Sequence, residues 1–131
     1  MATRRYIRVG LVVITAIVLA ALLPIIGASR ETNDVREVRL VARDMTYYVE
    51  GQDQPNPTLT FRAGERVKLV LRNEDDGMLH DFKVRAWEIG TGTIDGKGAD
   101  SVTFTVPRLR GSHVYSCTPH PSSMRGAIEI E

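Results

Sequence analysis

The sequence predicts an all-β domain of the Greek-key sandwich class, preceded by one N-terminal apolar helix. Two observations predict it. Apolar and polar residues alternate along several short segments after residue 35, which is the pattern of half-buried strands. An uncharged run of 20 residues lies near the start of the chain. Seven or eight short strands separated by turn signals are typical of a sandwich.

Alternation predicts three of the strands, at 37–42, 66–72 and 101–106, and the other short strands are expected between turn signals. In the clearest of them, residues 66–72, Val67, Leu69 and Leu71 alternate with mostly basic residues. The expected strands are 37–42, 46–49, 58–61, 66–72, 80–85, 101–106, 112–117 and 126–130. Glycine-containing turn signals separate them at 63–65, 75–77 and 95–98. The chain shows no internal repeat and no phosphate-binding glycine loop.

The N-terminal segment has the length of a membrane span. Residues 9–28 carry no charge and would rise about 30 Å as a helix, the thickness of the hydrocarbon core. Arg4, Arg5 and Arg8 precede them, which predicts a cytoplasmic N-terminus. The alternative is a cleaved signal peptide, with small residues at 27–29 as the cleavage site. N-terminal sequencing of the native protein separates the two.

Three parts follow from this pattern: a membrane anchor or signal peptide at 1–29, a short stalk at 30–34, and one domain at 35–131. We expect the domain on the periplasmic side of the cytoplasmic membrane, or free in the periplasm if the segment is cleaved. Three of the 17 basic residues and none of the 16 acidic ones precede residue 30, so residues 30–131 have a formal charge of −2. No basic surface for nucleic acid is implied.

The residues that carry chemistry lie mainly near the C-terminus. Cys117 is the only cysteine, and His120 and Met124 follow it closely. A thiolate, an imidazole and a thioether form a soft ligand set that suits copper cycling between Cu(I) and Cu(II). His80 is the best candidate for a second imidazole, because two His, one Cys and a weak axial Met are the ligands of electron-transfer copper centres.

Each of these residues taken alone has a plainer interpretation. A lone cysteine is more often a small buried hydrophobic residue, and a methionine usually fills a core. Structural zinc generally takes four Cys or His ligands, and a Cys–His nucleophile also needs an orienting third group and an oxyanion pocket. The joint occurrence of all four residues favours copper.

The expected strands would bring these residues to one pole of the sandwich. His80 opens a strand and Cys117 ends one, while the loop that carries His120 folds over the same end. His113 lies about 13 Å along its strand from Cys117, at about 3.3 Å per residue. We therefore interpret His113 as structural.

The run from Gly111 to His120, with Met124 and Gly126 after it and His80 before it, resembles the cupredoxin family of type 1 blue copper proteins. The resemblance covers nearly all of residues 35–131. The run from Cys117 to Pro121 is especially similar to amicyanin, and its Cys-x-x-His spacing is shared with plastocyanin and pseudoazurin. Three residues separate His120 from Met124, where plastocyanin has four and amicyanin two.

A second departure is Asp81, which stands where several relatives have Asn. It places a carboxylate next to the metal. We expect this carboxylate to hydrogen-bond the ligand loop or to disfavour the loss of positive charge on reduction.

The resemblance implies one type 1 copper held by His80, Cys117, His120 and Met124. It implies a monomeric electron carrier, not an enzyme, whose electron port is the exposed edge of His120. An apolar docking rim would come from Pro119, Pro121, Met124, Met45 and Met78. The implied partners are redox proteins, in particular membrane-bound respiratory components. The competing hypotheses are an extracytoplasmic copper-delivery protein and a structural module that has the fold without metal.

Overall fold

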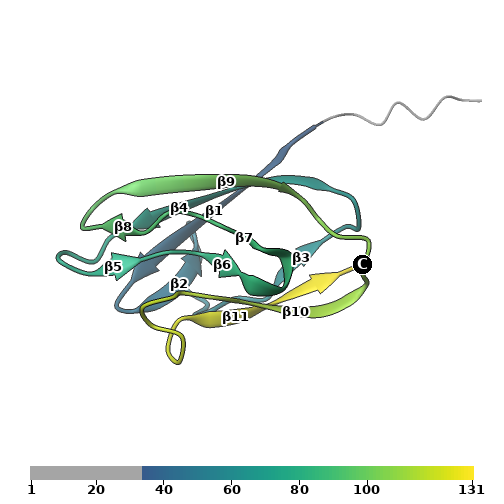
Figure 1. The fold of residues 1–131 in the computed structure, drawn as a ribbon. Helices are drawn as coiled ribbons and strands as arrows, with labels where there is room; N and C mark the ends of the chain where they lie inside the picture. The colour runs from purple at the N-terminus through teal and green to yellow at the C-terminus, as the bar shows by residue number, and fades with distance from the viewer. Residues whose placement is uncertain (1–33) are drawn as a thin grey trace, which may run out of the picture. The chain divides into compact units, whose positions relative to one another are not determined.

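Residues 34–131 are described by a computed structural model, and their regular structure is β apart from one short 3-10 helix. Figure 1 shows the strands in two layers. The strands of the first sheet are β1 (Arg36–Arg43), β2 (Thr46–Val49), β4 (Arg66–Asn73) and β9 (Ala99–Thr105). Their spatial order is β2-β1-β4-β9, with β1 and β4 parallel and the other neighbours antiparallel.

The second sheet carries the C-terminal strands. Its members are β3 (Leu59–Phe61), β6 (Lys83–Val84), β7 (Ile89–Gly90), β10 (Gly111–Ser116) and β11 (Arg125–Ile130). Their spatial order is β3-β11-β10-β6-β7, and β3 and β11 run parallel. A separate antiparallel ribbon joins β5 (Leu79–His80) to β8 (Ile94–Asp95).

Most of the strands expected from the sequence are confirmed. The expected strand 46–49 matches β2, and those at 66–72, 112–117 and 126–130 match β4, β10 and β11 to within one residue at either end. Strands β7 and β8 were not expected, because two residues are too short to show any periodicity.

The expected single strand at 80–85 is wrong. The chain forms β5 and β6 with a break at Asp81 and Phe82, and then a 3-10 helix at Arg85–Trp87. At the break, two backbone groups bond to side chains instead of to a neighbouring strand. Phe82 N donates to Thr91 Oγ1 at 3.0 Å, and the Asp81 carbonyl accepts a hydrogen bond from Tyr47 Oη. The break lets β5 pair with β8, while β6 pairs with β10 and β7.

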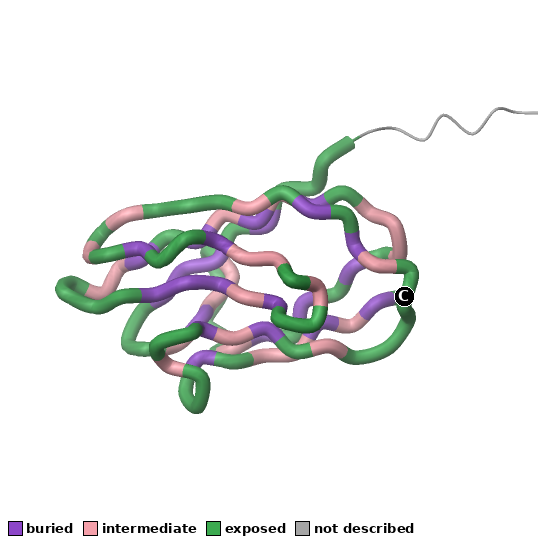
Figure 2. Tube along the Cα trace, in the orientation of Figure 1, coloured by how far each residue is buried: buried purple, intermediate pink, exposed green. Residues whose placement is uncertain are grey.

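The core lies between the two layers, where alternate strand residues point inward. Figure 2 shows the resulting succession of buried and exposed positions along the strands. An aromatic cluster of Tyr47, Phe82 and Tyr115 fills the part of the core next to the site described below. Tyr115 stacks on Phe82 with ring centroids 5.2 Å apart and meets Tyr47 edge-on at 5.4 Å. The Tyr115 hydroxyl donates to the Pro57 carbonyl at 2.6 Å.

The expected membrane anchor or signal peptide at 1–29 lies outside the described residues. Within residues 34–131, no helix has the length and apolar character needed to cross a membrane.

Candidate metal centre

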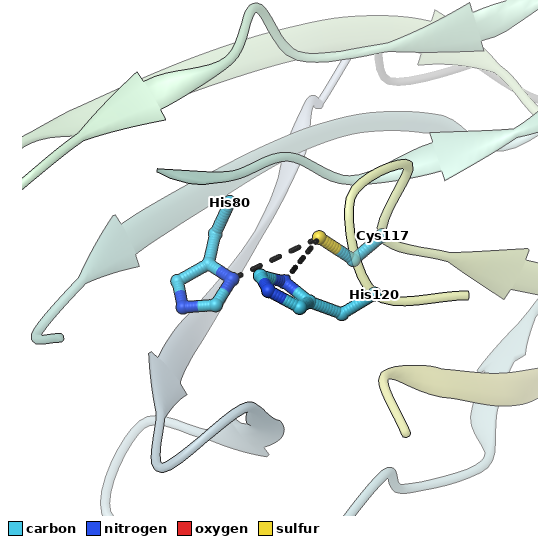
Figure 3. Close-up of side chains that lie close together, drawn as sticks. All are labelled: His80, Cys117 and His120. Carbon is cyan, nitrogen blue, oxygen red and sulfur yellow. Dashed lines mark hydrogen bonds between the residues drawn. The ribbon is translucent and has the colours of Figure 1, made fainter. Parts of the chain in front are cut away.

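Three side chains from two segments of the chain converge at one end of the sandwich. His80 ends β5, Cys117 directly follows β10, and His120 lies in the loop between β10 and β11. Their possible ligand atoms all lie within 4.8 Å of one another. Cys117 Sγ lies 3.8 Å from His80 Nδ1 and 3.7 Å from His120 Nδ1, and Figure 3 shows both rings turned towards the sulfur.

These distances suit a single metal ion. Metal bonds to imidazole nitrogen and thiolate sulfur are about 2.0 and 2.3 Å long, with zinc as the reference. Two such bonds that diverge by about 120° place the nitrogen and the sulfur about 3.7 Å apart, as observed. Two imidazoles and one thiolate in a trigonal arrangement are the donor set of electron-transfer copper sites. The three residues therefore fit copper.

Cys117 is completely buried, and backbone hydrogen bonds close the loop that follows it. Cys117 N donates to the Met124 carbonyl at 2.9 Å, and Met124 N donates to the His120 carbonyl at 2.9 Å. Burial raises the pKa of the Cys117 thiol, because the anion loses its hydration. A bound cation would stabilise the thiolate, so metal binding at this site would release the thiol proton.

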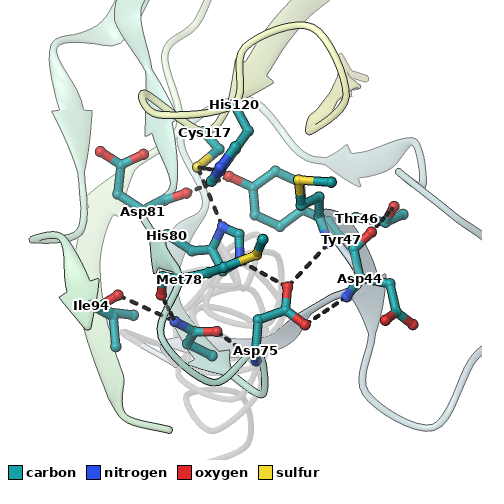
Figure 4. Close-up of polar contacts among 12 residues, drawn as sticks. Asp44, Thr46, Tyr47, Asp75, Met78, His80, Asp81, Ile94, Cys117 and His120 are labelled. Atoms are coloured by element: carbon teal, nitrogen blue, oxygen red, sulfur yellow. Dashed lines mark hydrogen bonds and ion pairs between the residues drawn. The ribbon is translucent and has the colours of Figure 1, made fainter. Parts of the chain in front are cut away.

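The His80 ring contacts Asp75 on the side that faces away from Cys117. The ring is fully buried, and Nε2 lies 2.9 Å from Asp75 Oδ2 (Figure 4). Partial burial by itself would raise the pKa of Asp75. Hydrogen bonds from the backbone NH groups of Met45 and Asp44 and from His80 outweigh that effect and lower the pKa. Asp75 is therefore an ionised carboxylate at neutral pH.

Asp81 joins the two halves of the site. Its side chain is buried, and Oδ1 accepts a hydrogen bond from Thr118 N at 2.6 Å. The predicted hydrogen bond between this carboxylate and the ligand loop is thus confirmed. It connects the residue after His80 to the residue after Cys117, so the two ligands are fixed relative to each other.

Met124 is fully buried in the same core cluster as Cys117. Its expected place in an exposed docking rim is therefore wrong. The other members of that rim are confirmed as exposed: Pro119, Pro121, Met45 and Met78. Leu79 is also exposed and was missed. The axial-ligand role of Met124 stays a prediction.

Two variants of Met124 test that role. A weak axial ligand tunes the reduction potential without holding the metal. We expect Met124→Leu to retain copper and raise the potential and Met124→Gln to lower it, each by about 59 mV, which is a tenfold change in relative affinity for a one-electron couple. The exposed Met78→Leu is the matched control, with an unchanged potential. Unshifted potentials in both Met124 variants would place its sulfur off the metal.

His113 takes no part in the cluster, as predicted. Trp87 Nε1 donates to His113 Nδ1 at 3.3 Å, and His113 Nε2 lies 3.2 Å from the Leu109 carbonyl oxygen. Both ring nitrogens are therefore occupied within the fold, which makes this histidine structural.

The sequence reasoning missed Asp75, which contacts His80, and Tyr47, which binds the Asp81 carbonyl. The sequence alone places Asp75 in a turn signal. A carboxylate five positions before a histidine in a turn carries no periodic signal, so the contact could not be predicted from spacing.

No protein-family model matches this sequence, and no curated protein matches it. Several solved structures do match the fold of this chain. A reduced rusticyanin is 23% identical over 72% of this chain and 78% of that chain, with a TM-score of 0.57. Auracyanin A, a blue copper protein from Chloroflexus aurantiacus, is 16% identical over 75% of this chain and 100% of that chain, with a TM-score of 0.56. A reduced Cu(I) form of an amicyanin variant is 26% identical over 72% and 82%, with a TM-score of 0.50.

These comparisons show the fold of this chain. Residues 34–131 have the cupredoxin fold, with the Cys and His donors gathered at the end of the sandwich. The resemblance drawn from the sequence is confirmed.

Proposed function

We propose that this protein is a type 1 copper electron-transfer protein and not an enzyme. The observation that carries the proposal is the convergence of His80 Nδ1, Cys117 Sγ and His120 Nδ1 on a volume that one ion can fill. Copper, when bound, supplies a one-electron Cu(I)/Cu(II) couple. The ligands would be these three atoms together with Met124 as a weak fourth ligand.

The surroundings of the site support an electron carrier, because they hold the ligands in place. The backbone bonds between Cys117, His120 and Met124 close the ligand loop, and Asp81 ties that loop to the segment carrying His80. A site held in this way keeps nearly one geometry in both oxidation states. Little reorganisation would then accompany electron transfer.

The surface around His120 suits brief docking of a redox partner. His120 is the only one of the three clustered residues that is partly exposed. The segments that form or contact the site carry five exposed apolar side chains: Met45, Met78, Leu79, Pro119 and Pro121. Small redox interfaces bury less than about 1,200 Å² and are weak. We propose redox proteins as partners, in particular membrane-bound respiratory components.

The location of the domain is also a proposal. The uncharged run 9–28 and the arginines before it support a tether that holds the domain outside the cytoplasmic membrane. A native N-terminus that begins near Arg30 would instead indicate export with cleavage.

Copper retention separates a carrier from a copper donor. A donor must release Cu(I), which requires His80 and Cys117 to part, yet both are fully buried. We expect the purified copper protein to keep its copper through repeated chemical reduction and reoxidation in the presence of a moderate-affinity Cu(I) chelator. The measurement is the visible absorption that returns after each reoxidation.

The matched control is His80→Gly, which removes one ligand and should lose copper to the same chelator. If the unaltered protein transfers its copper to the chelator within a few cycles, the carrier proposal fails and copper delivery becomes the better account.

A further inference from the structure

The side of His80 that faces away from Cys117 meets an acidic residue outside the ligand set. Asp75 lies in the loop between β4 and β5, with a side chain only 13% exposed, and its Oδ2 lies 2.9 Å from His80 Nε2. Figure 4 shows the carboxylate between the imidazole and the turn that joins β1 to β2. The contact is therefore enclosed by two loops.

The turn between β1 and β2 fixes the carboxylate. Asp44 N donates to Asp75 Oδ1 at 2.8 Å, and Met45 N donates to Oδ2 at 3.1 Å. Asp44 and Met45 both have φ of 52°, the left-handed conformation, and this turn directs their NH groups at the carboxylate. Both carboxylate oxygens are thus held by backbone donors.

The backbone of Asp75 is also held, by the side chain of Asn73 at the end of β4. Asp75 N donates to Asn73 Oδ1 at 2.9 Å. Asn73 Nδ2 in turn donates to the carbonyls of Met78 at 2.7 Å and Ile94 at 3.2 Å. Asn73 is itself buried. Rotating the Asp75 side chain away from His80 would break the hydrogen bonds from Asp44 N and Met45 N, and moving its backbone would break the hydrogen bond to Asn73.

This arrangement selects one tautomer of the ring. Both Asp75 oxygens accept hydrogen bonds from backbone NH groups, so Oδ2 meets the ring as an acceptor and His80 Nε2 carries the proton that lies between them. Nδ1 then has a free lone pair, and Nδ1 is the atom that faces Cys117 Sγ at 3.8 Å. A fixed negative charge on the far side of the ring also favours the more highly charged oxidation state of a metal bound at Nδ1.

We propose that Asp75 is the positioning residue for His80, fixing its Nδ1 as the metal-binding atom and lowering the reduction potential of the copper site. The inference rests on the proposed copper function and adds a residue to it. A residue that only joined two turns would affect the stability of the domain but not the tautomer of His80 or the ratio of Cu(II) to Cu(I) affinity.

The first test needs neither copper nor a variant. Nitrogen-15 NMR of the imidazoles in the metal-free protein should show His80 protonated at Nε2, with that proton protected from exchange with solvent. A His80 protonated at Nδ1 in the neutral ring would overturn the proposal. The result does not depend on whether the protein binds copper, so it separates this inference from the proposed function.

The second test compares two Asp-to-Asn variants in the copper-loaded protein. Asp75→Asn keeps an oxygen acceptor and removes the charge. We expect the Cu(II)/Cu(I) affinity ratio to fall about tenfold, which raises the potential by about 59 mV. Asp76→Asn removes the same charge from the exposed neighbouring residue, and we expect a shift several-fold smaller.

Asp75→Ala completes the series, since it removes both the charge and the acceptor. We expect it to raise the potential at least as far and to lower copper affinity by about 10- to 100-fold. Equal shifts in Asp75→Asn and Asp76→Asn, or no shift in Asp75→Asn, would overturn the proposal.

If the wild-type protein binds no copper, the proposed function fails first. If the variants do not fold, the NMR measurement on the unaltered protein still decides the tautomer.

Discussion

Replacing Cys117 with serine is expected to abolish the intense visible absorption of the Cu(II) protein and to leave its all-β fold intact. The absorption arises from charge transfer between thiolate and copper, and Cys117 is the only thiol in the chain. A hydroxyl is a hard ligand that binds copper far more weakly than a thiolate. A serine side chain has the shape of cysteine and is slightly smaller, so the buried position of Cys117 can hold it without steric strain.

The fold of Cys117→Ser is measured by far-ultraviolet circular dichroism, and its copper content by metal analysis beside the visible spectrum. His113→Ala is the matched control, because this histidine lies outside the cluster and should leave the colour unchanged. Colour that persisted in Cys117→Ser would contradict the assignment of the thiolate ligand.

Replacing Gly126 with alanine should cause a large loss of stability in the domain. Gly126 lies opposite Tyr115 in the pairing of β10 with β11. A Cβ on residue 126 would lie 2.6 Å from Cε1 of Tyr115 and closer still to Cζ and the hydroxyl. The Tyr115 ring cannot move away from the added methyl group, because it stacks on Phe82 and its hydroxyl donates to the Pro57 carbonyl.

Overpacking of this kind costs about 2 to 3 kcal/mol, which lowers the Tm of a domain of this size by roughly 10 to 20 °C. Thermal unfolding of the metal-free protein measures it. Gly92→Ala is the matched control, because its Cβ would meet only the end of the Asp100 side chain, at 3.2 Å. Equal stability of Gly126→Ala and the unaltered protein would mean that the aromatic cluster is not rigid.

The sequence alone could predict the parts of this protein that depend on local pattern. Alternation placed β4 because this strand has one buried face. The ligand residues His80, Cys117 and His120 could be chosen because copper needs their donor atoms, and strand geometry then put them at one end. The structure brings these three together.

The parts that could not be predicted depend on contacts between distant segments. The strand expected at 80–85 breaks because Asp81 and Phe82 bind groups from elsewhere, among them Tyr47, 34 positions away. The contact between Asp75 and the Met45 amide spans 30 positions. The alternation of apolar and polar residues along the sequence carries no information about such distant pairs. The burial of Met124 was missed for another reason: its position in a ligand loop suggested exposure, whereas its side chain belongs to the core.

The central claim is that the cluster of His80, Cys117 and His120 holds one copper ion that changes oxidation state in place. An anaerobic redox titration of the purified copper protein, followed by the visible absorption, tests it most directly. The account predicts one copper per chain and a single reversible one-electron transition, with the same curve in the oxidative and reductive directions. Absence of the visible absorption, a second copper per chain, or loss of copper on reduction would contradict it.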